Sequence, residues 1–160
     1  MKVIAFDFAY RVRKQYGEGA FAVFERWLEE YVRSWGDCDD FCTHAFGELI
    51  CQYPHLSDGL LRWTQRDEFW MRRAAAVVLI PAIRRGQHAE TNPLRVADLL
   101  MHDEHDLVRK GYGWMLKVLS EKEPQLVFDY LMKHRQAMPR VAFRYAMEKM
   151  GAEQRRILMQ

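Results

Sequence analysis

Residues 34–42 read Ser34-Trp35-Gly36-Asp37-Cys38-Asp39-Asp40-Phe41-Cys42 and separate two amphipathic runs of the sequence. One helix is expected to end before this stretch and another to begin within it. Acids in a first turn bind free N–H groups and complement the helix dipole, which makes Asp37 the natural cap. If Trp35 and Asp39 share this helix, their spacing of four places them on one face. An aromatic ring beside a carboxylate suits the stabilisation of a cation.

The rest of the chain predicts helices, because apolar residues recur at spacings of three and four. No segment reads as a strand, and Gly and Pro fall mostly between the helical segments. Helices are expected up to Gly17, at 20–32, and from Asp37 to the Tyr53-Pro54 stop, whereas 86–92 is the expected loop. A shorter helix followed by a longer one then recurs at 57–65 with 68–83, 93–101 with 104–120, and 124–134 with 139–150.

Two-helix units of roughly 35 to 45 residues are typical of the HEAT and armadillo class of solenoids. The units are not obviously alike in sequence, so this interpretation rests on the lengths of the elements. We therefore predict an all-α protein, a single HEAT-like α-solenoid domain over residues 1–160, built from antiparallel helix pairs with a concave face. Trp63 and Trp70 are expected to lie in its core.

Composition narrows the function classes. The chain has 160 residues, 49% of them hydrophobic, and a net charge of only +2, so a nucleic-acid partner requires a local basic patch. No apolar run is long enough to cross a bilayer and no signal-peptide pattern is present, which predicts a cytoplasmic protein without a membrane partner. Cys38, Cys42 and Cys51 are an odd count without finger-like partners, so neither structural disulfides nor structural zinc are expected.

Two alternative sites are less well supported by the sequence. Residues 1–8 resemble the first strand of an α/β phosphohydrolase, but that chemistry requires a second acid two residues after Asp7, and Ala9 stands there. Residues 102–106, His102-Asp103-Glu104-His105-Asp106, resemble a metal-binding cluster. A helix start explains them better, with Asp103 as the cap and Asp106 at the capping-box position.

Three residues recur with the period of the stack. Asp39, Arg73 and Trp114 are 34 and then 41 positions apart, and each falls on the longer helix of its pair. One such residue per unit converges on the same stripe of the concave surface. Read alone, Trp114 is better explained as an ordinary core residue, because buried aromatic side chains are common.

At these residues the sequence resembles the AlkD-type alkylpurine DNA glycosylases, a bacterial DNA alkylation-repair family built from HEAT-like repeats. The resemblance rests on three blocks in order: Trp35-x-x-x-Asp39, Trp70-Met71-Arg72-Arg73-Ala74-Ala75, and Val108-Arg109-Lys110-Gly111-Tyr112-Gly113-Trp114-Met115-Leu116-Lys117. The flanking segments Pro54-His55-Leu56 and Lys122-Glu123-Pro124 also fit. Gly36 and Gly111 depart from the pattern, because bulkier residues are common at both places.

The resemblance implies an enzyme that hydrolyses the N-glycosidic bond of cationic alkylated purines in double-stranded DNA, without metal or cofactor. By the family pattern Asp39 stabilises the sugar cation and positions the attacking water. Trp35 and Trp114 hold the deoxyribose and backbone of the lesion between their rings, and Arg73 grips a phosphate.

The resemblance also implies DNA-binding residues around these four. Lys110 and Lys117 are expected to assist Arg73 at the phosphates. Arg72 and Arg73 lie about 100° apart on a helix, so only one can face the groove squarely. We place Arg73 there and interpret Arg72 as a solvated charge that adds to DNA binding.

The resemblance covers roughly residues 1–150 and matches the C-terminal two-thirds of a usual family member. The repeats that normally precede this region are expected to be absent, and another chain is a candidate to replace them. The alternative interpretation is a catalytically inactive or truncated module that keeps the curved stack but only binds DNA or docks a protein.

Overall fold

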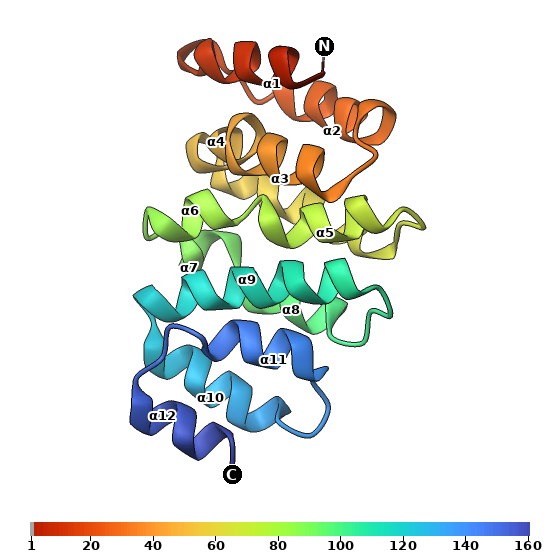
Figure 1. The fold of residues 1–160 in the computed structure, drawn as a ribbon. Helices are drawn as coiled ribbons and strands as arrows, with labels where there is room; N and C mark the ends of the chain where they lie inside the picture. Colours follow the sequence, from red (N-terminus) through yellow and green to blue (C-terminus); the bar gives the residue numbers. More distant parts are fainter. Residues whose placement is uncertain (1) are drawn as a thin grey trace.

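A computed structural model of the protein describes the backbone of residues 2–160 and the side chains of residues 4–160 (Figure 1). Every regular element in this part is helical. The α-helices are α1 (Lys2–Arg11), α2 (Ala20–Tyr31), α3 (Trp35–Thr43), α4 (Ala45–Gln52), α5 (Phe69–Val77), α6 (Ile80–Arg84), α7 (His88–Thr91), α8 (Pro93–Leu100), α9 (Asp106–Lys122), α10 (Pro124–His134), α11 (Arg140–Met147) and α12 (Ala152–Leu158). Two 3-10 helices, η1 (Arg13–Gln15) and η2 (Pro54–Gln65), complete the set.

The helices stack from the N-terminus to the C-terminus as an α-solenoid, which confirms the predicted fold class (Figure 1). Helices α3, α5, α9 and α11 follow one another down one side of the stack, and each packs against the next. Helix α8 lies behind α9 in this view and forms the other layer. Three helices of this first layer, α3, α5 and α9, carry the predicted site residues.

Polar contacts between units confirm the one-dimensional character of the stack. Among the described residues, long-range side-chain hydrogen bonds join residues 31 to 39 positions apart, apart from one contact 19 positions apart near the C-terminus. Glu48, for example, accepts a hydrogen bond from Arg85, 37 positions later. Each unit is therefore bonded only to its neighbours.

Several helix boundaries differ from the prediction. The expected helix from Asp37 to Tyr53 is divided at His44, whose φ of −118° and ψ of −94° lie outside the helical region. The predicted helix 57–65 is part of a 3-10 helix, and 68–83 is divided between Val77 and Ile80 ahead of the bend expected at Pro81. Residues 86–92 contain the short helix α7.

Two predicted caps were wrong. At α3 the Ser34 hydroxyl, not Asp37, is the cap, and it accepts a hydrogen bond of 3.2 Å from the Asp37 backbone N–H. The donor therefore lies three residues after the cap, in the usual geometry. At α9 the His105 Nδ1 is the cap and accepts from the Leu107 N–H, whereas the Asp103 carboxylate accepts from the His105 N–H and pairs with Arg72 of α5.

The core runs the length of the stack. Trp63 is fully buried, as predicted, whereas Trp70 is only half-buried and packs against the core. All three cysteines are buried free thiols, and burial raises the pKa of Cys51 to about 11. Among the described residues, no helix is long and apolar enough to span a membrane.

The N-terminal end of the solenoid is apolar on its outside. Helices α1 and α2 flank a groove of about 400 Å³, and two α1 side chains, Ile4 and Phe8, are 71% and 66% exposed. The terminal units of solenoids usually carry a polar outer face. We predicted that another chain replaces the preceding repeats, and this stays a prediction. Such a chain would pack against this N-terminal end.

The close packing of α9 against α11 depends on Gly113. A Cβ atom at this position would lie 2.8 Å from the Cβ of Tyr145, 3.0 Å from the Ala142 carbonyl oxygen and 3.2 Å from the Ala142 Cα. These atoms belong to the α11 backbone or its immediate neighbourhood, so they cannot move without moving the helix. Gly113 therefore sets the distance between α9 and α11.

We predict that Gly113→Ala destabilises the protein. Overpacking costs roughly 1–3 kcal/mol, and the better helix propensity of Ala offsets at most about 1 kcal/mol. Thermal unfolding should show a melting temperature lower by roughly 2–4 °C for each kcal/mol lost. Gly17→Ala is the control, because nothing lies within 4 Å of its Cβ position. An unchanged melting temperature for Gly113→Ala would contradict the close contact.

Candidate functional site

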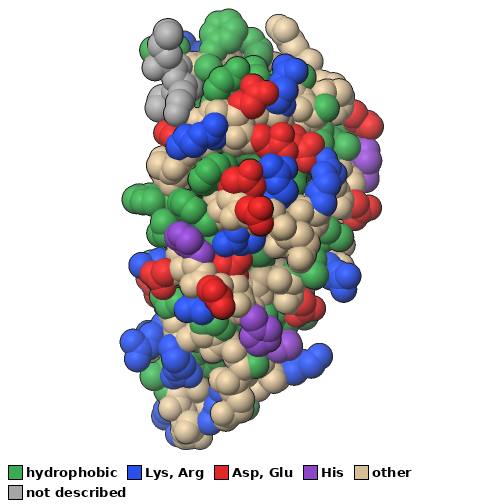
Figure 2. All heavy atoms as spheres, turned by 90° about the vertical axis from the view of Figure 1, so that its right-hand side faces the viewer, with side chains coloured by type: hydrophobic (Ala, Val, Ile, Leu, Met, Phe, Trp, Pro, Cys, Tyr) green, Lys and Arg blue, Asp and Glu red, His purple; other side chains and the backbone are tan. Residues whose placement is uncertain are grey.

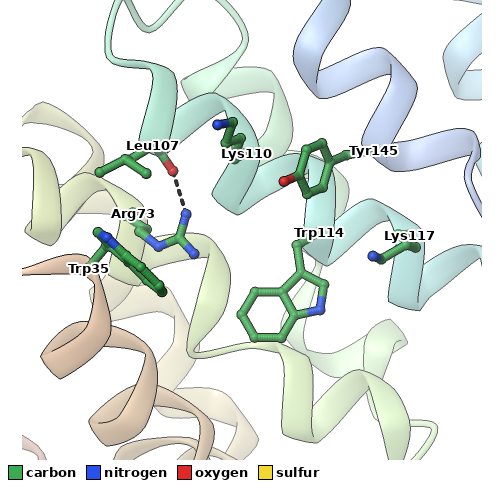
Figure 3. Close-up of a pocket in the computed structure, with 7 residues that line it drawn as sticks. All are labelled: Trp35, Arg73, Leu107, Lys110, Trp114, Lys117 and Tyr145. Carbon is green, nitrogen blue, oxygen red and sulfur yellow. Dashed lines mark hydrogen bonds between the residues drawn. The ribbon is translucent and has the colours of Figure 1, made fainter.

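Side chains from four consecutive units of the stack line one open pocket (Figure 3). The pocket has a volume of about 300 Å³. Its lining residues come from α3, α5, α9 and α11, and they are Trp35, Arg73, Leu107, Lys110, Trp114, Lys117 and Tyr145. Five of the seven predicted site residues are among them. Asp39 lies directly behind Arg73, and Arg72 lies elsewhere.

Helix α9 contributes four of the seven lining residues. Leu107, Lys110, Trp114 and Lys117 follow one another at spacings of three, four and three, so they form one stripe along the helix. The opposite face of α9 is buried, with Val108, Met115 and Leu119 in the core. The amphipathic pattern of this helix therefore aims the stripe at the pocket.

Arg73 and Asp39 form a two-pronged ion pair beneath the pocket. The Arg73 Nε donates to Asp39 Oδ1 and Nη2 donates to Oδ2, both at 2.8 Å. Nη1 donates to the Leu107 backbone carbonyl, the bond drawn in Figure 3. Three of the five N–H groups of the guanidinium are thus used within the protein. One side chain of α5 thereby joins α3 and α9.

This ion pair is shielded from water, with the Arg73 side chain 7% and the Asp39 side chain 18% exposed. Burial by itself lowers the pKa of Arg73, but the hydrogen bonds and charge of Asp39 outweigh it and raise that pKa above its ordinary value. The guanidinium is therefore charged at any physiological pH, and the carboxylate has a permanent counter-charge at bonding distance.

Gly111 provides the space for this guanidinium. A Cβ atom at Gly111 would lie 3.0 Å from the Arg73 Cγ and 3.3 Å from its Nη1. The glycine that departs from the family pattern in the sequence thus has a structural reason in this chain. A larger residue would push Arg73 away from α9.

The two predicted tryptophans reach the pocket from different units. Trp35 stands in the first turn of α3 and is 54% exposed, whereas Trp114 is half-buried and packs against the core. Figure 3 shows the Trp35 ring beside Arg73 and the Trp114 ring on the far side of the pocket. Trp114 is therefore both a core residue and a site residue, and the two interpretations of it do not exclude each other.

The two lysines each have an acidic partner within the protein. Lys110 lies 3.1 Å from Asp106, one turn earlier on α9. The Lys117 ammonium lies 3.2 Å from Glu148 of the next unit. Both pairs have a half-exposed acid, and ion pairs of this kind contribute about 1 kcal/mol or less. The lysines can therefore exchange these partners for another anion at little cost.

Arg72 points away from the pocket. Its Nε donates to Asp103 at 2.6 Å, and Nη1 donates to the carbonyls of Arg66 and Asp67. The interpretation of Arg72 as a solvated charge was wrong, because its side chain is only 19% exposed and holds the η2–α5 connection to the start of α9. Its role in DNA binding stays a prediction.

Tyr145 of α11 lines the pocket and was missing from the sequence-based set. Its ring lies 5.5 Å from the Lys117 ammonium, and its hydroxyl points into the pocket (Figure 3). A signal was present in the sequence. Asp39, Arg73 and Trp114 mark successive units, and one further step of 31 residues reaches Tyr145.

Comparison with known proteins places this chain in a family. The family model described as DNA alkylation repair enzyme matches residues 1–150. The chain belongs to the DNA alkylation repair enzyme family. Its membership points to DNA as the substrate and to an enzymatic repair function. The narrower resemblance to the AlkD type, and to the C-terminal two-thirds of its members, stays a prediction.

A solved structure agrees with this family in fold. It is described as a predicted DNA alkylation repair enzyme from Enterococcus faecalis, and the match has a TM-score of 0.77 at 18% sequence identity. The match covers 93% of this chain and 68% of that chain. At this identity the likeness concerns the fold. Among curated proteins no match was found.

The alternative site at residues 102–106 leads into helix α9, which begins at Asp106. His105 caps α9 and stacks on Phe69 at 4.1 Å between ring centroids, while Asp103 pairs with Arg72. Within residues 4–160 the structure has no group of three or more His, Cys, Asp or Glu side chains arranged to hold a metal ion.

We predict that Arg73→Met destabilises the protein by about 3–5 kcal/mol, because it leaves the shielded Asp39 carboxylate without its counter-charge. Chemical denaturation would measure the loss. The control is Lys110→Met, which removes an exposed pair and should change the free energy of unfolding by about 0.5 kcal/mol.

If Arg73→Met does not fold, the double variant Asp39→Asn/Arg73→Met tests whether the unpaired carboxylate causes the loss of stability. It removes both charges and should recover part of the stability. A single Arg73→Met variant as stable as the wild type would show that the pair does not hold the site together.

Proposed function

We propose that this protein is a DNA glycosylase that hydrolyses the N-glycosidic bond of cationic alkylated purines in double-stranded DNA, of the 7-methylguanine and 3-methyladenine type. The observation that carries the proposal is the Asp39 carboxylate, held by Arg73 under an open pocket between Trp35 and Trp114. Membership of the DNA alkylation repair family supports the substrate class.

The reaction requires little from the protein. A purine alkylated at N7 or N3 is already cationic, so when the bond from the sugar C1′ to the base breaks, its electron pair neutralises the base. The sugar becomes oxocarbenium-like, water adds to C1′, and the water proton passes to Asp39 or to solvent. The products are the free alkylated base and an abasic site. Negative charge and aromatic faces beside the sugar are the groups that lower this barrier.

Asp39 is the group proposed to stabilise the sugar cation. A carboxylate about 4 Å from a unit positive charge contributes roughly 4 kcal/mol at an effective dielectric constant near 20, and the paired guanidinium lowers that figure. Each Asp39 oxygen accepts one hydrogen bond from Arg73, and a carboxylate offers about four acceptor sites. Acceptor capacity therefore remains for an attacking water.

The surrounding side chains suit a DNA backbone. Trp35 and Trp114 offer aromatic faces to the deoxyribose, and Lys110, Lys117 and the Tyr145 hydroxyl offer donors to phosphate oxygens. The pocket is open, and exposure of Trp35 supports contact with the sugar and backbone of the lesion. Under this proposal the protein recognises the lesion through its backbone and charge.

The second candidate function is a binding module that grips DNA without cleaving the glycosidic bond. One observation favours it: both oxygens of Asp39 are bonded to a permanently charged guanidinium, which weakens the field of the carboxylate at the pocket. The lysines would bind phosphates equally well in an inactive protein. Base release by the pure protein separates the two candidates.

We predict that wild-type protein releases 7-methylguanine from methylated duplex DNA, and that Asp39→Asn lowers the single-turnover rate by about 10²–10³-fold. Chromatography of the released base would measure both rates. The matched control is Asp40→Asn on the same helix, because the Asp40 carboxylate lies 3.4 Å from His44 and away from the pocket. The control should release base within about threefold of the wild type.

Equal rates for the wild type and Asp39→Asn would remove Asp39 from the catalytic role. No release by either protein, with salt-sensitive binding of the same duplex, would favour the binding module.

A further inference from the structure

Positive charge is concentrated at the C-terminal end of the chain. Residues 133–160 contain seven Lys or Arg and two acids, a net charge of +5 in a chain whose total is +2. The preceding residues are therefore acidic on balance. Figure 2 shows the same asymmetry on one face, where the acidic side chains stop above the lowest part of the stack and Lys and Arg side chains continue.

Helix α11 connects this basic end to the pocket. Ala142, Phe143, Ala146 and Met147 face the core, so the opposite face of α11 is the exposed one. Tyr145 lies on the α9 side of that exposed face, where it lines the pocket.

Two arginines occupy the other side of the exposed face. Arg144 precedes Tyr145 by about 100° of helix rotation, away from α9, and Arg140 lies one turn earlier on the same stripe. The Arg140 guanidinium reaches the end of α12, with Nη2 3.9 Å from the Sδ of Met159, the residue that follows this helix. The exposed surface therefore runs from the pocket across Arg144 and Arg140 to α12.

Both arginines are available to an anion. Arg140 and Arg144 are exposed, and neither forms an ion pair with any residue that the structure describes. Arg140 lies over the Phe143 ring at 5.0 Å, a contact that orients the guanidinium without neutralising it. This differs from Lys110 and Lys117, which both have acidic partners.

The other side of the pocket is acidic. Helix α3 continues beyond Trp35 with Asp37 and Asp40, whereas Asp7 of α1, which lies with Asp40 at a neighbouring hollow, is paired with Arg11. The Asp37 and Asp40 carboxylates repel phosphates, so this distribution of charge favours a duplex that lies toward the C-terminal end.

We propose that the DNA next to the lesion crosses the C-terminal end of the solenoid, and that Arg140 and Arg144 bind consecutive phosphates of one strand. Packed helices lie roughly 8–10 Å apart, and one strand of a duplex rises about 3.4 Å per nucleotide. Arg140 and Arg144 therefore lie about three nucleotides from the pocket. The proposal rests on the proposed function for the position of the lesion. The phosphate contacts themselves require only that the protein binds duplex DNA.

The test measures binding of an undamaged 24-base-pair duplex by fluorescence anisotropy at several salt concentrations. Each phosphate contact contributes about 0.9 to the slope of log affinity against log salt. Arg140→Gln/Arg144→Gln should lower that slope by about 2 and weaken binding at low salt by at least about tenfold. The control is Arg26→Gln/Arg95→Gln, which removes the same charge from exposed residues of α2 and of α8 behind α9.

An unchanged slope for Arg140→Gln/Arg144→Gln, or an equal loss in the control, would overturn the proposal. Melting temperatures within about 2 °C of the wild type would show that both double variants fold. The outcome is separable from that of the glycosylase proposal. If the wild type releases no base but Arg140→Gln/Arg144→Gln has a lower salt slope, the phosphate contacts are supported and the glycosylase proposal is rejected. If the wild type releases base but the slope of the double variant is unchanged, the glycosylase proposal is supported and the phosphate contacts are rejected.

Discussion

The buried guanidinium of Arg73 is the constraint on which the site depends. A charge this far from water is stable only when it is neutralised and hydrogen-bonded. Asp39 supplies the counter-charge from the unit before, and the Leu107 carbonyl supplies an acceptor from the unit after. Three consecutive units must therefore take one relative position to satisfy a single side chain. That position also brings Trp35 and Trp114 to the same pocket.

The ion pairs around the pocket differ in how easily they can open. The Arg73–Asp39 pair is shielded and two-pronged, so breaking it leaves an unpaired charge in a poorly solvated place. The pairs of Lys110 and Lys117 face solvent and can be replaced by a phosphate at little cost. The protein thus separates two tasks. One pair fixes geometry, and the weaker pairs are free to change partners.

Much of this arrangement could be predicted from the sequence, because residues one repeat apart occupy equivalent places on successive units of a solenoid. The recurring pairs of helices predicted the stack, and the spacing of Asp39, Arg73 and Trp114 predicted one stripe. The partner of Arg73 could not be predicted, since a guanidinium on that stripe can equally face a substrate phosphate or a carboxylate of the previous unit. That choice depends on a distance between helices that Gly111 helps to set.

Local boundaries were harder to predict for a different reason. Ser34 and Asp37 are both good caps, and His44 ends α3 although the apolar pattern continues through it. The spacing of apolar residues indicates which face of a helix is buried. It does not reveal a single residue whose backbone leaves helical geometry. Tyr145 could not be predicted from the three family blocks, because it lies one unit beyond the last of them.

The restriction of polar bonds to neighbouring units has a mechanical consequence. A body linked only from each layer to the next behaves like a spring, whose small tilts between layers add up along its length. The indoles of Trp35 and Trp114 stand two layers apart, so a slight flexing at the α3–α5 and α5–α9 contacts changes the gap between them. The width of the pocket opening near Asp39 thus depends on the tilt between successive units. A variant that changes this tilt changes the width of the opening, even when the substituted residue is far from the carboxylate.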